Sequence, residues 1–287
     1  MDRLLGLVVL AACAHQAPQP APIVVSPYRE LLVPAVIDGR HLTLMIDTGA
    51  STTTLTPAAC NRLLLNYYGL PGRGDGITGP IDDITLVKVG FLEIADHVVH
   101  QPYAAVVDMA AASRSIDGVL GMDVLGDYTT EVDLSRRQLI LHPRTATAWR
   151  TPDLIAFSYH RLRGGQLWID AFVDGRPVAA IIDLGANLSF ANVRATPDRE
   201  EAALIVRAVV GADRHIAQFA AMRDVPVVVG PLDLMAGALL IADLPIFDVV
   251  GLSDRPAMIL GADLLGGRRL VIAPNEQRLY VSLRGSP

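Results

Sequence analysis

Short apolar runs, separated by Gly, Pro and Asp, recur along most of the chain. Many are rich in β-branched residues, which is typical of strands in a sheet. We therefore predict an all-β protein. The clearest runs are LLVPAVI (31–37), LTLMI (42–46), ITLVKV (84–89), AAVV (104–107), QLILH (138–142), LWIDAFV (167–173), VAAII (178–182), VPVVV (225–229), ALLIA (238–242), RLVIA (269–273) and RLYVSL (278–283).

Helical signals are few. Residues 57–65 are predicted to form a helix, because Thr56 can cap its start and Pro57 suits the first helical position. Further short helices are expected after Gly121 and Gly261. Strands should therefore carry most of the core.

Two stretches of the chain repeat one pattern around an aspartate. Asp38-Gly39 leads through an apolar run to Asp47, and Asp174-Gly175 leads in the same way to Asp183. The offset is 136 residues throughout. Asp-Gly pairs between apolar runs are typical of two-residue hairpin turns, so each aspartate should follow the second strand of a hairpin.

The repeat continues downstream at a slightly larger offset. Val89-Gly90 recurs as Val229-Gly230, and LGMD (120–123) recurs as LGAD (260–263), both at an offset of 140 residues. Repeats in solenoids are shorter, roughly 20–50 residues. The pattern therefore predicts two similar half-domains in one chain.

The repetition changes how the two aspartates are interpreted. A single Asp at a strand end more often caps a turn than performs chemistry. Two acids brought together can share one proton, so that one can accept a proton while the other donates one. Asp47 and Asp183 are therefore the candidate catalytic residues.

These motifs resemble those of a known family. The sequence DTGA (47–50) after an apolar strand, a glycine-rich segment, and then VLG (119–121) together resemble the aspartic peptidases. Ala50 and Ala186 favour the retropepsin-like branch. The resemblance covers nearly all of residues 28–284, once as a good match and once as a degraded one.

The resemblance implies two similar retropepsin-like β-barrel lobes and peptide-bond hydrolysis by water held between Asp47 and Asp183. It implies no metal and no cofactor, and a peptide or protein substrate. The residues expected to support the two acids are Thr48, Gly49, Ala50 and Gly185.

Leu184 departs from the family pattern. In the family, the Thr after each Asp forms a hydrogen bond across the lobe interface, which Thr48 can do and Leu184 cannot. Three interpretations follow: a monomeric single-chain enzyme, a peptide-binding module that no longer cuts, or an enzyme in which two first lobes dimerise and two copies of Asp47 form the pair.

A glycine-rich segment lies between the two parts of the first motif. It spells GxGxxG, but Pro80 follows in place of a helix, so a dinucleotide site is not expected. A flap that closes over substrate is predicted instead, with a plain surface loop as the alternative. Its glycines are Gly74, Gly76 and Gly79, and Gly211 is a weaker candidate for the second lobe's equivalent.

The N-terminus resembles a bacterial lipoprotein signal. Residues 1–13 contain Arg3 and an apolar run that is too short to span a bilayer, and Cys13 would be the lipidated residue. A buried N-terminal helix is the alternative. The Pro/Ala-rich residues 14–27 are predicted to be a tether. An exported protein at the periplasmic face is expected, held at the membrane and favouring the outer membrane.

The remaining chain is predicted to form a first lobe (28–143), a linker (144–153) and a second, degenerate lobe (154–287). A formal net charge of -6 argues against a nucleic-acid partner. Cys60 has no partner once Cys13 carries lipid, so a packed thiol is expected. The apolar stretch 225–252 is better explained by strands than by a membrane span, because its Pro and Asp residues are costly in lipid.

Overall fold

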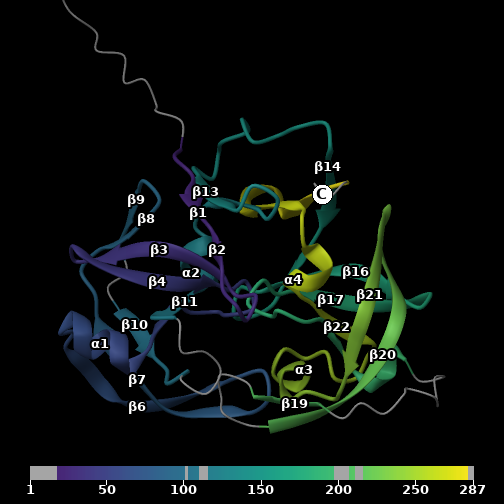
Figure 1. The fold of residues 1–287 in the computed structure, drawn as a ribbon, viewed down its shortest axis with the longest axis horizontal. Coiled ribbons are helices and arrows are strands. Elements are labelled where there is room, and N and C mark those ends of the chain that lie inside the picture. Colours follow the sequence, from purple (N-terminus) through teal and green to yellow (C-terminus); the bar gives the residue numbers. More distant parts are fainter. Residues whose placement is uncertain (1–17, 101–102, 110–115, 197–206, 211–215, 284–287) are drawn as a thin grey trace, which may run out of the picture.

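The structure, a computed structural model, describes residues 18–100, 103–109, 116–196, 207–210 and 216–283. Strands dominate these residues and form three sheets, which confirms the predicted all-β class. Figure 1 shows the first lobe and the second lobe side by side, with a third sheet at one end of both.

The sheet of the first lobe has ten strands. Nine of them follow one another by hydrogen bonding, and β2 (Val24–Val25) pairs beside them with β3. Their order is β6 (Tyr67–Asp75), β7 (Pro80–Lys88), β10 (Tyr103–Val106), β5 (Thr54–Leu55), β11 (Gly118–Leu120), β4 (Arg40–Ile46), β3 (Leu31–Ile37), β8 (Leu92–Ile94) and β9 (His97–Val99).

The sheet of the second lobe has eight strands in a similar arrangement. As β11 lies parallel to β4 in the first lobe, β22 lies parallel to β17 here. The order is β15 (His160–Arg161), β16 (Leu167–Val173), β17 (Arg176–Ile182), β22 (Ala257–Leu260), β18 (Phe190–Ala191), β21 (Leu232–Ile241), β20 (Ile216–Val229) and β19 (Arg207–Val210).

A six-stranded sheet joins the lobes and is called the shared sheet below. At its centre β12 of the first half pairs antiparallel with β23 of the second. The order is β1 (Ala21–Pro22), β13 (Gln138–His142), β12 (Thr129–Asp133), β23 (Arg269–Ala273), β24 (Arg278–Ser282) and β14 (Leu154–Ser158).

The two predicted hairpin turns are confirmed. Asp38 and Gly39 have φ values of 48° and 80°, and Asp174 and Gly175 have 50° and 78°. Two successive residues with positive φ define the turn that matches the twist of paired strands. Each hairpin therefore delivers the following aspartate at the end of its second strand.

The predicted helices are present and short. α1 (Pro57–Leu63) begins after Thr56, whose side chain accepts a hydrogen bond from the Ala59 N–H, and it ends at Leu64 in the left-handed conformation. α2 (Met122–Leu125) follows Gly121, and α4 (Ala262–Leu265) follows Gly261. A fourth helix, α3 (Pro245–Val249), was not predicted.

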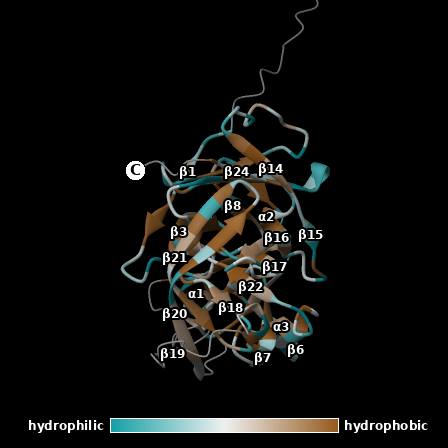
Figure 2. Cartoon of the chain, turned by 90° about the vertical axis from the view of Figure 1, so that its right-hand side faces the viewer, coloured by the Kyte–Doolittle hydropathy of each residue, from teal (hydrophilic) through white to brown (hydrophobic). Residues whose placement is uncertain are grey.

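Hydrophobic strands form the interior, and hydrophilic residues concentrate in the loops between them (Figure 2). The largest buried cluster includes residues from both halves, such as Leu44, Val132, Ile182 and Leu270. The lobes are therefore packed together through a common core as well as through the shared sheet.

Two expectations about apolar segments have clear outcomes. Residues 21–25, which were assigned to the tether, form β1 and β2, and Ala21 and Ile23 are buried, so the tether prediction was too long. β1 pairs with β13 and β2 pairs with β3, and the buried apolar side chains of this segment alternate with exposed ones. Residues 225–252 form parts of β20 and β21 followed by α3. Within the described ranges, no helix is long and apolar enough to cross a membrane.

Candidate active site

Parallel strand pairs place the two aspartates in matching positions. Asp47 follows β4, and its N–H donates to the carbonyl of Leu120 at 3.1 Å. Asp183 follows β17, and its N–H donates to the carbonyl of Leu260 at the same distance. Each acid is thus anchored to the neighbouring strand of its own lobe.

In the first lobe, the residues after the acid turn back toward its carboxyl group. The N–H groups of Gly49 and Ala50 donate to Asp47 Oδ1 at 2.8 and 2.9 Å. Two amide donors favour the charged form of a carboxyl group.

The second lobe repeats this arrangement. The N–H groups of Gly185 and Ala186 donate to Asp183 Oδ1 at 2.9 and 3.1 Å. The degraded motif therefore keeps the turn geometry of the intact one, although Leu184 replaces the Thr.

The two acid-bearing loops meet face to face. A Cβ on Gly49 would lie 2.5 Å from Cγ of Asp183, and a Cβ on Gly185 would lie 2.3 Å from Cγ of Asp47. Any side chain at either glycine would collide with the acid of the other lobe. A hydrogen bond also joins the two carboxyl groups, so the structure brings together the pair that the sequence predicts.

The environment favours one shared proton. Burial, followed by the negative charge of Asp183, raises the pKa of Asp47 well above its usual value. Burial also raises the pKa of Asp183, while the hydrogen bonds from Asp47, Ala186 and Gly185 act in the opposite direction. The two carboxyl groups are therefore expected to share one proton as a pair.

Thr48 crosses the lobe interface and holds the opposite loop. Its buried hydroxyl donates to the carbonyl of Ile182 at 2.8 Å and accepts from the N–H of Leu184 at 3.0 Å. The Leu184 side chain is also buried and has no polar atom to return these bonds. The connection between the loops is therefore one-sided.

A second layer of polar contacts supports both loops, and sequence reasoning missed it. Asp123 accepts from the hydroxyl and the N–H of Thr53 at 2.7 and 2.8 Å. In the second lobe, Asp263 accepts from the hydroxyl and the N–H of Ser189 at 2.6 and 3.1 Å. The repeated Asp of LGMD and LGAD was the available signal for these contacts.

The predicted flap glycines lie at and beside the tip of a hairpin. Gly74 is in β6, and the Gly76 N–H donates to the Gly79 carbonyl at 2.8 Å where the chain turns into β7. Between them, Ile77 packs against an apolar cluster of the second lobe that includes Phe190. The hairpin tip therefore reaches across to the other lobe. Gly211 lies outside the described residues.

Of the two cysteines, only Cys60 lies among the described residues. Cys60 is buried, and burial raises the pKa of its thiol to about 11, which makes it a packed thiol, as predicted, and a poor nucleophile. Cys13 lies outside the described residues. Across the part of the chain that the structure covers, no three His, Cys, Asp or Glu side chains group as metal ligands would.

The first lobe matches a known protein family. Residues 33–124 match the model of a family described as aspartyl protease. The first lobe is therefore similar to the aspartyl proteases, and a protease-type function is supported. The match ends before Asp183, so the internal duplication stays a prediction. No curated protein matches the chain.

Proposed function

We propose that the protein is a single-chain aspartic endopeptidase in which Asp47 and Asp183 act together on one water molecule. The observation that supports this proposal most directly is the packing of each acid against the glycine of the opposite loop. Such packing is expected of a pair that works as one group, since neither carboxyl group is free to turn away.

The reaction would begin with one proton on the pair. One of the two aspartates, as the carboxylate, accepts a proton from water while the oxygen of that water attacks the carbonyl carbon of the peptide bond. The other aspartate donates its proton to the carbonyl oxygen, giving a neutral tetrahedral intermediate. Proton transfer to the nitrogen and cleavage of the C–N bond then release an amine and a carboxylic acid.

The shared sheet supports a monomer over a dimer of first lobes. Glu131 faces Val271 in the pairing of β12 with β23, and these two residues are equivalent in the repeat. A first lobe paired with another first lobe would therefore place Glu131 opposite a second Glu131. Like charges directly opposite each other destabilise a sheet, and Glu131 is buried.

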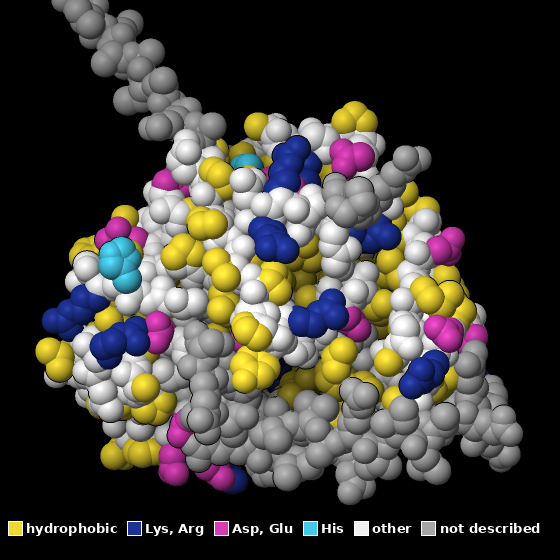
Figure 3. Space-filling model, viewed as in Figure 1, with side chains coloured by type: hydrophobic (Ala, Val, Ile, Leu, Met, Phe, Trp, Pro, Cys, Tyr) yellow, Lys and Arg dark blue, Asp and Glu magenta, His cyan; other side chains and the backbone are white. Residues whose placement is uncertain are grey.

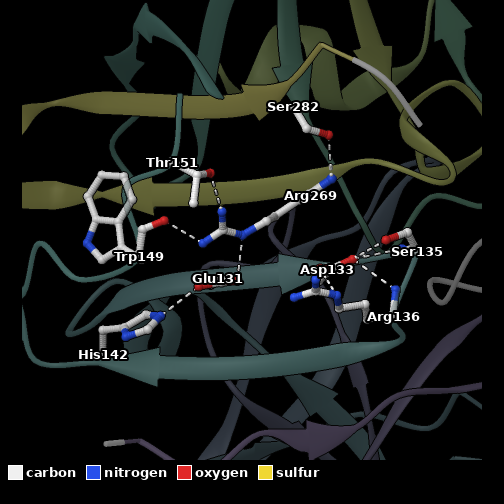
Figure 4. A network of polar contacts seen from close by, with 9 residues as sticks. All are labelled: Glu131, Asp133, Ser135, Arg136, His142, Trp149, Thr151, Arg269 and Ser282. Atoms are coloured by element: carbon white, nitrogen blue, oxygen red, sulfur yellow. Dashed lines mark hydrogen bonds and ion pairs between the residues drawn. The ribbon is translucent and has the colours of Figure 1, made fainter. Parts of the chain in front are cut away.

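The second lobe supplies the cation that this buried acid needs. Arg269 donates to Glu131 Oε1 at 2.6 Å, and His142 Nε2 lies 2.7 Å from Glu131 Oε2 (Figure 4). The repeat places Thr129 at the position in the first lobe that corresponds to Arg269. A dimer of first lobes would lack this arginine, which favours the single-chain enzyme.

The rival function is a peptide-binding module that has lost activity. Leu184 favours it, because one reciprocal hydrogen bond between the loops is missing. Cleavage of a mixed peptide library by the chain from Pro18 onward, compared with Asp47→Asn, separates the two functions. Cleavage that the substitution abolishes supports the enzyme, whereas peptide binding without cleavage supports the module.

We also propose export to the periplasmic face, a lipid anchor at Cys13 and a peptide or protein substrate. Lys and Arg side chains are scattered over the face in Figure 3 and form no single patch there, in keeping with a partner other than nucleic acid. Cys13→Ser should release the protein from membranes or leave it unprocessed. Unchanged membrane association would contradict the anchor.

A further inference from the structure

Leu184 has no hydroxyl with which to form a hydrogen bond to the Asp47 loop, but another side chain of the second lobe forms one. Before β16, residues 162–166 form a turn in which the Leu162 N–H donates to the Gln166 carbonyl at 2.9 Å. From this turn, Gln166 Nε2 donates to the carbonyl oxygen of Gly49 at 3.1 Å. We infer that Gln166 is a positioning residue that holds the Asp47 loop from the opposite lobe.

The bond acts on one peptide unit beside the acid. The carbonyl of Gly49 and the N–H of Ala50 belong to the same planar peptide, so a partner on the carbonyl fixes the direction of the N–H. That N–H donates to Asp47 Oδ1 at 2.9 Å. Gln166 therefore acts on the carboxyl group through the peptide and makes no contact with substrate in this role.

Close packing keeps the turn in place over the loop. A Cβ on Gly164 would lie 2.9 Å from Cβ of Ser51, and a Cβ on Gly165 would lie 3.5 Å from Cβ of Met122. Gln166 Oε1 is buried and has no hydrogen-bond partner among the described residues. The cost of that unpaired oxygen indicates that the amide is held there for the bond made by its nitrogen.

The repeat shows that this hold is specific to one lobe. Glu30 is equivalent to Gln166 at the offset of 136 residues, and its turn has the same backbone bonds. Its carboxylate accepts instead from the hydroxyl of Ser26 at 2.7 Å. Thr48 thus holds the Asp183 loop from the first lobe, and Gln166 holds the Asp47 loop from the second.

The test rests on the proposed peptidase activity and begins with the unmodified chain. Gln166→Met keeps the length of the side chain and removes the donor. We expect kcat to fall by roughly 10- to 100-fold with little change in KM, because the acid is misplaced while substrate contacts remain. The pH–rate profile should move to higher pH, since a weaker amide bond to Asp47 raises the pKa of the pair.

A rescue experiment distinguishes positioning from general loss of structure. Leu184→Thr adds the missing reciprocal hydroxyl, so it should restore activity at least ~3-fold in Gln166→Met and change the unmodified enzyme by less than ~2-fold. Glu30→Gln is the matched control and should leave kcat and the pH profile unchanged. Gln166→Glu, of nearly the same shape, should lose at least as much activity as Gln166→Met by placing an acceptor against the carbonyl.

The outcomes separate this inference from the proposed function. Absence of cleavage by the unmodified chain contradicts the peptidase. Cleavage by the unmodified chain with an unchanged rate and pH profile in a folded Gln166→Met or Gln166→Glu variant overturns the role of Gln166 alone. Equal loss of activity in Gln166→Met and Glu30→Gln, with no rescue by Leu184→Thr, also overturns it.

Discussion

The two lobes repeat the same strand pairings but differ where they touch. Both acids accept two amide hydrogen bonds, and both loops are supported by an Asp bonded to a hydroxyl. The differences are Thr48 against Leu184 and Glu131 against Val271, which face each other across the lobe boundary. The individual loops thus share one geometry, whereas the contacts between the lobes are complementary and not identical.

The largest expected effect tests whether the lobes contribute equally to catalysis. Asp47→Asn and Asp183→Asn should each lower kcat by at least about 10³-fold, because neither acid can act alone. Peptide cleavage by the purified variants measures this, and activity per chain should not change on dilution. A nearly silent Asp183→Asn, with activity falling on dilution, would instead support a dimer of first lobes.

The next effect concerns stability at the shared sheet. Arg269→Met should destabilise the fold by about 3–5 kcal/mol, because Glu131 would remain buried without its cation. Urea unfolding measures the change. Arg62→Met, which removes an exposed ion pair to Asp117, is the control and should cost less than ~1 kcal/mol. Equal effects would contradict a specific role for the pair across the lobes.

A smaller effect should follow loss of the hydrogen bonds that the Thr48 hydroxyl makes to the Asp183 loop. Thr48→Val keeps the shape of the side chain but leaves the buried carbonyl of Ile182 and the N–H of Leu184 without this hydroxyl, at a cost of about 1–3 kcal/mol. Unfolding and kcat should both be affected. If Thr48→Val is as active and stable as the parent, the hydrogen bonds of Thr48 to the Asp183 loop contribute nothing to activity or to the free energy of unfolding.

The smallest effect is the dependence of stability on pH. A raised pKa for Asp47 means that the folded state binds its proton more tightly than the unfolded chain does. Its contribution to stability is therefore fully present below the unfolded value and is lost as pH rises through the folded value. Asp47→Asn should remove this loss, so its melting temperature relative to the parent should rise from pH 4 to pH 7. A constant difference across this range would argue against the raised pKa.

Local patterns were enough to predict most strands, because alternating or continuous apolar runs reflect burial on one or both faces. β12 (TTEVD) was missed, since Glu131 and Asp133 are polar yet buried. Their partners come from β23 and from the turn after β12, which a local pattern does not reveal. β6 was missed because its residues are mostly exposed and it contains several glycines.

The candidate site was predictable only where the repeat marked it. Asp47 and Asp183 stood out because each motif appears twice in the sequence. Gln166 has no such signal, since its counterpart is Glu30 and its contact with Gly49 exists only once the lobes meet. Contacts between segments far apart in sequence therefore account for most of what the sequence left open.

The pairing of β1 with β13 also limits how far the folded domain could lie from a lipid anchor at Cys13. If Cys13 carries lipid, the residues between it and Ala21 could reach at most roughly 20 Å, whereas a tether as far as residue 27 could reach roughly 40 Å. In Figure 1 the chain enters the fold at the end that carries the shared sheet, and the hairpin of β6 and β7 lies at the opposite end. In a protein anchored at Cys13, the hairpin of β6 and β7 would therefore lie at the end of the fold away from the anchor.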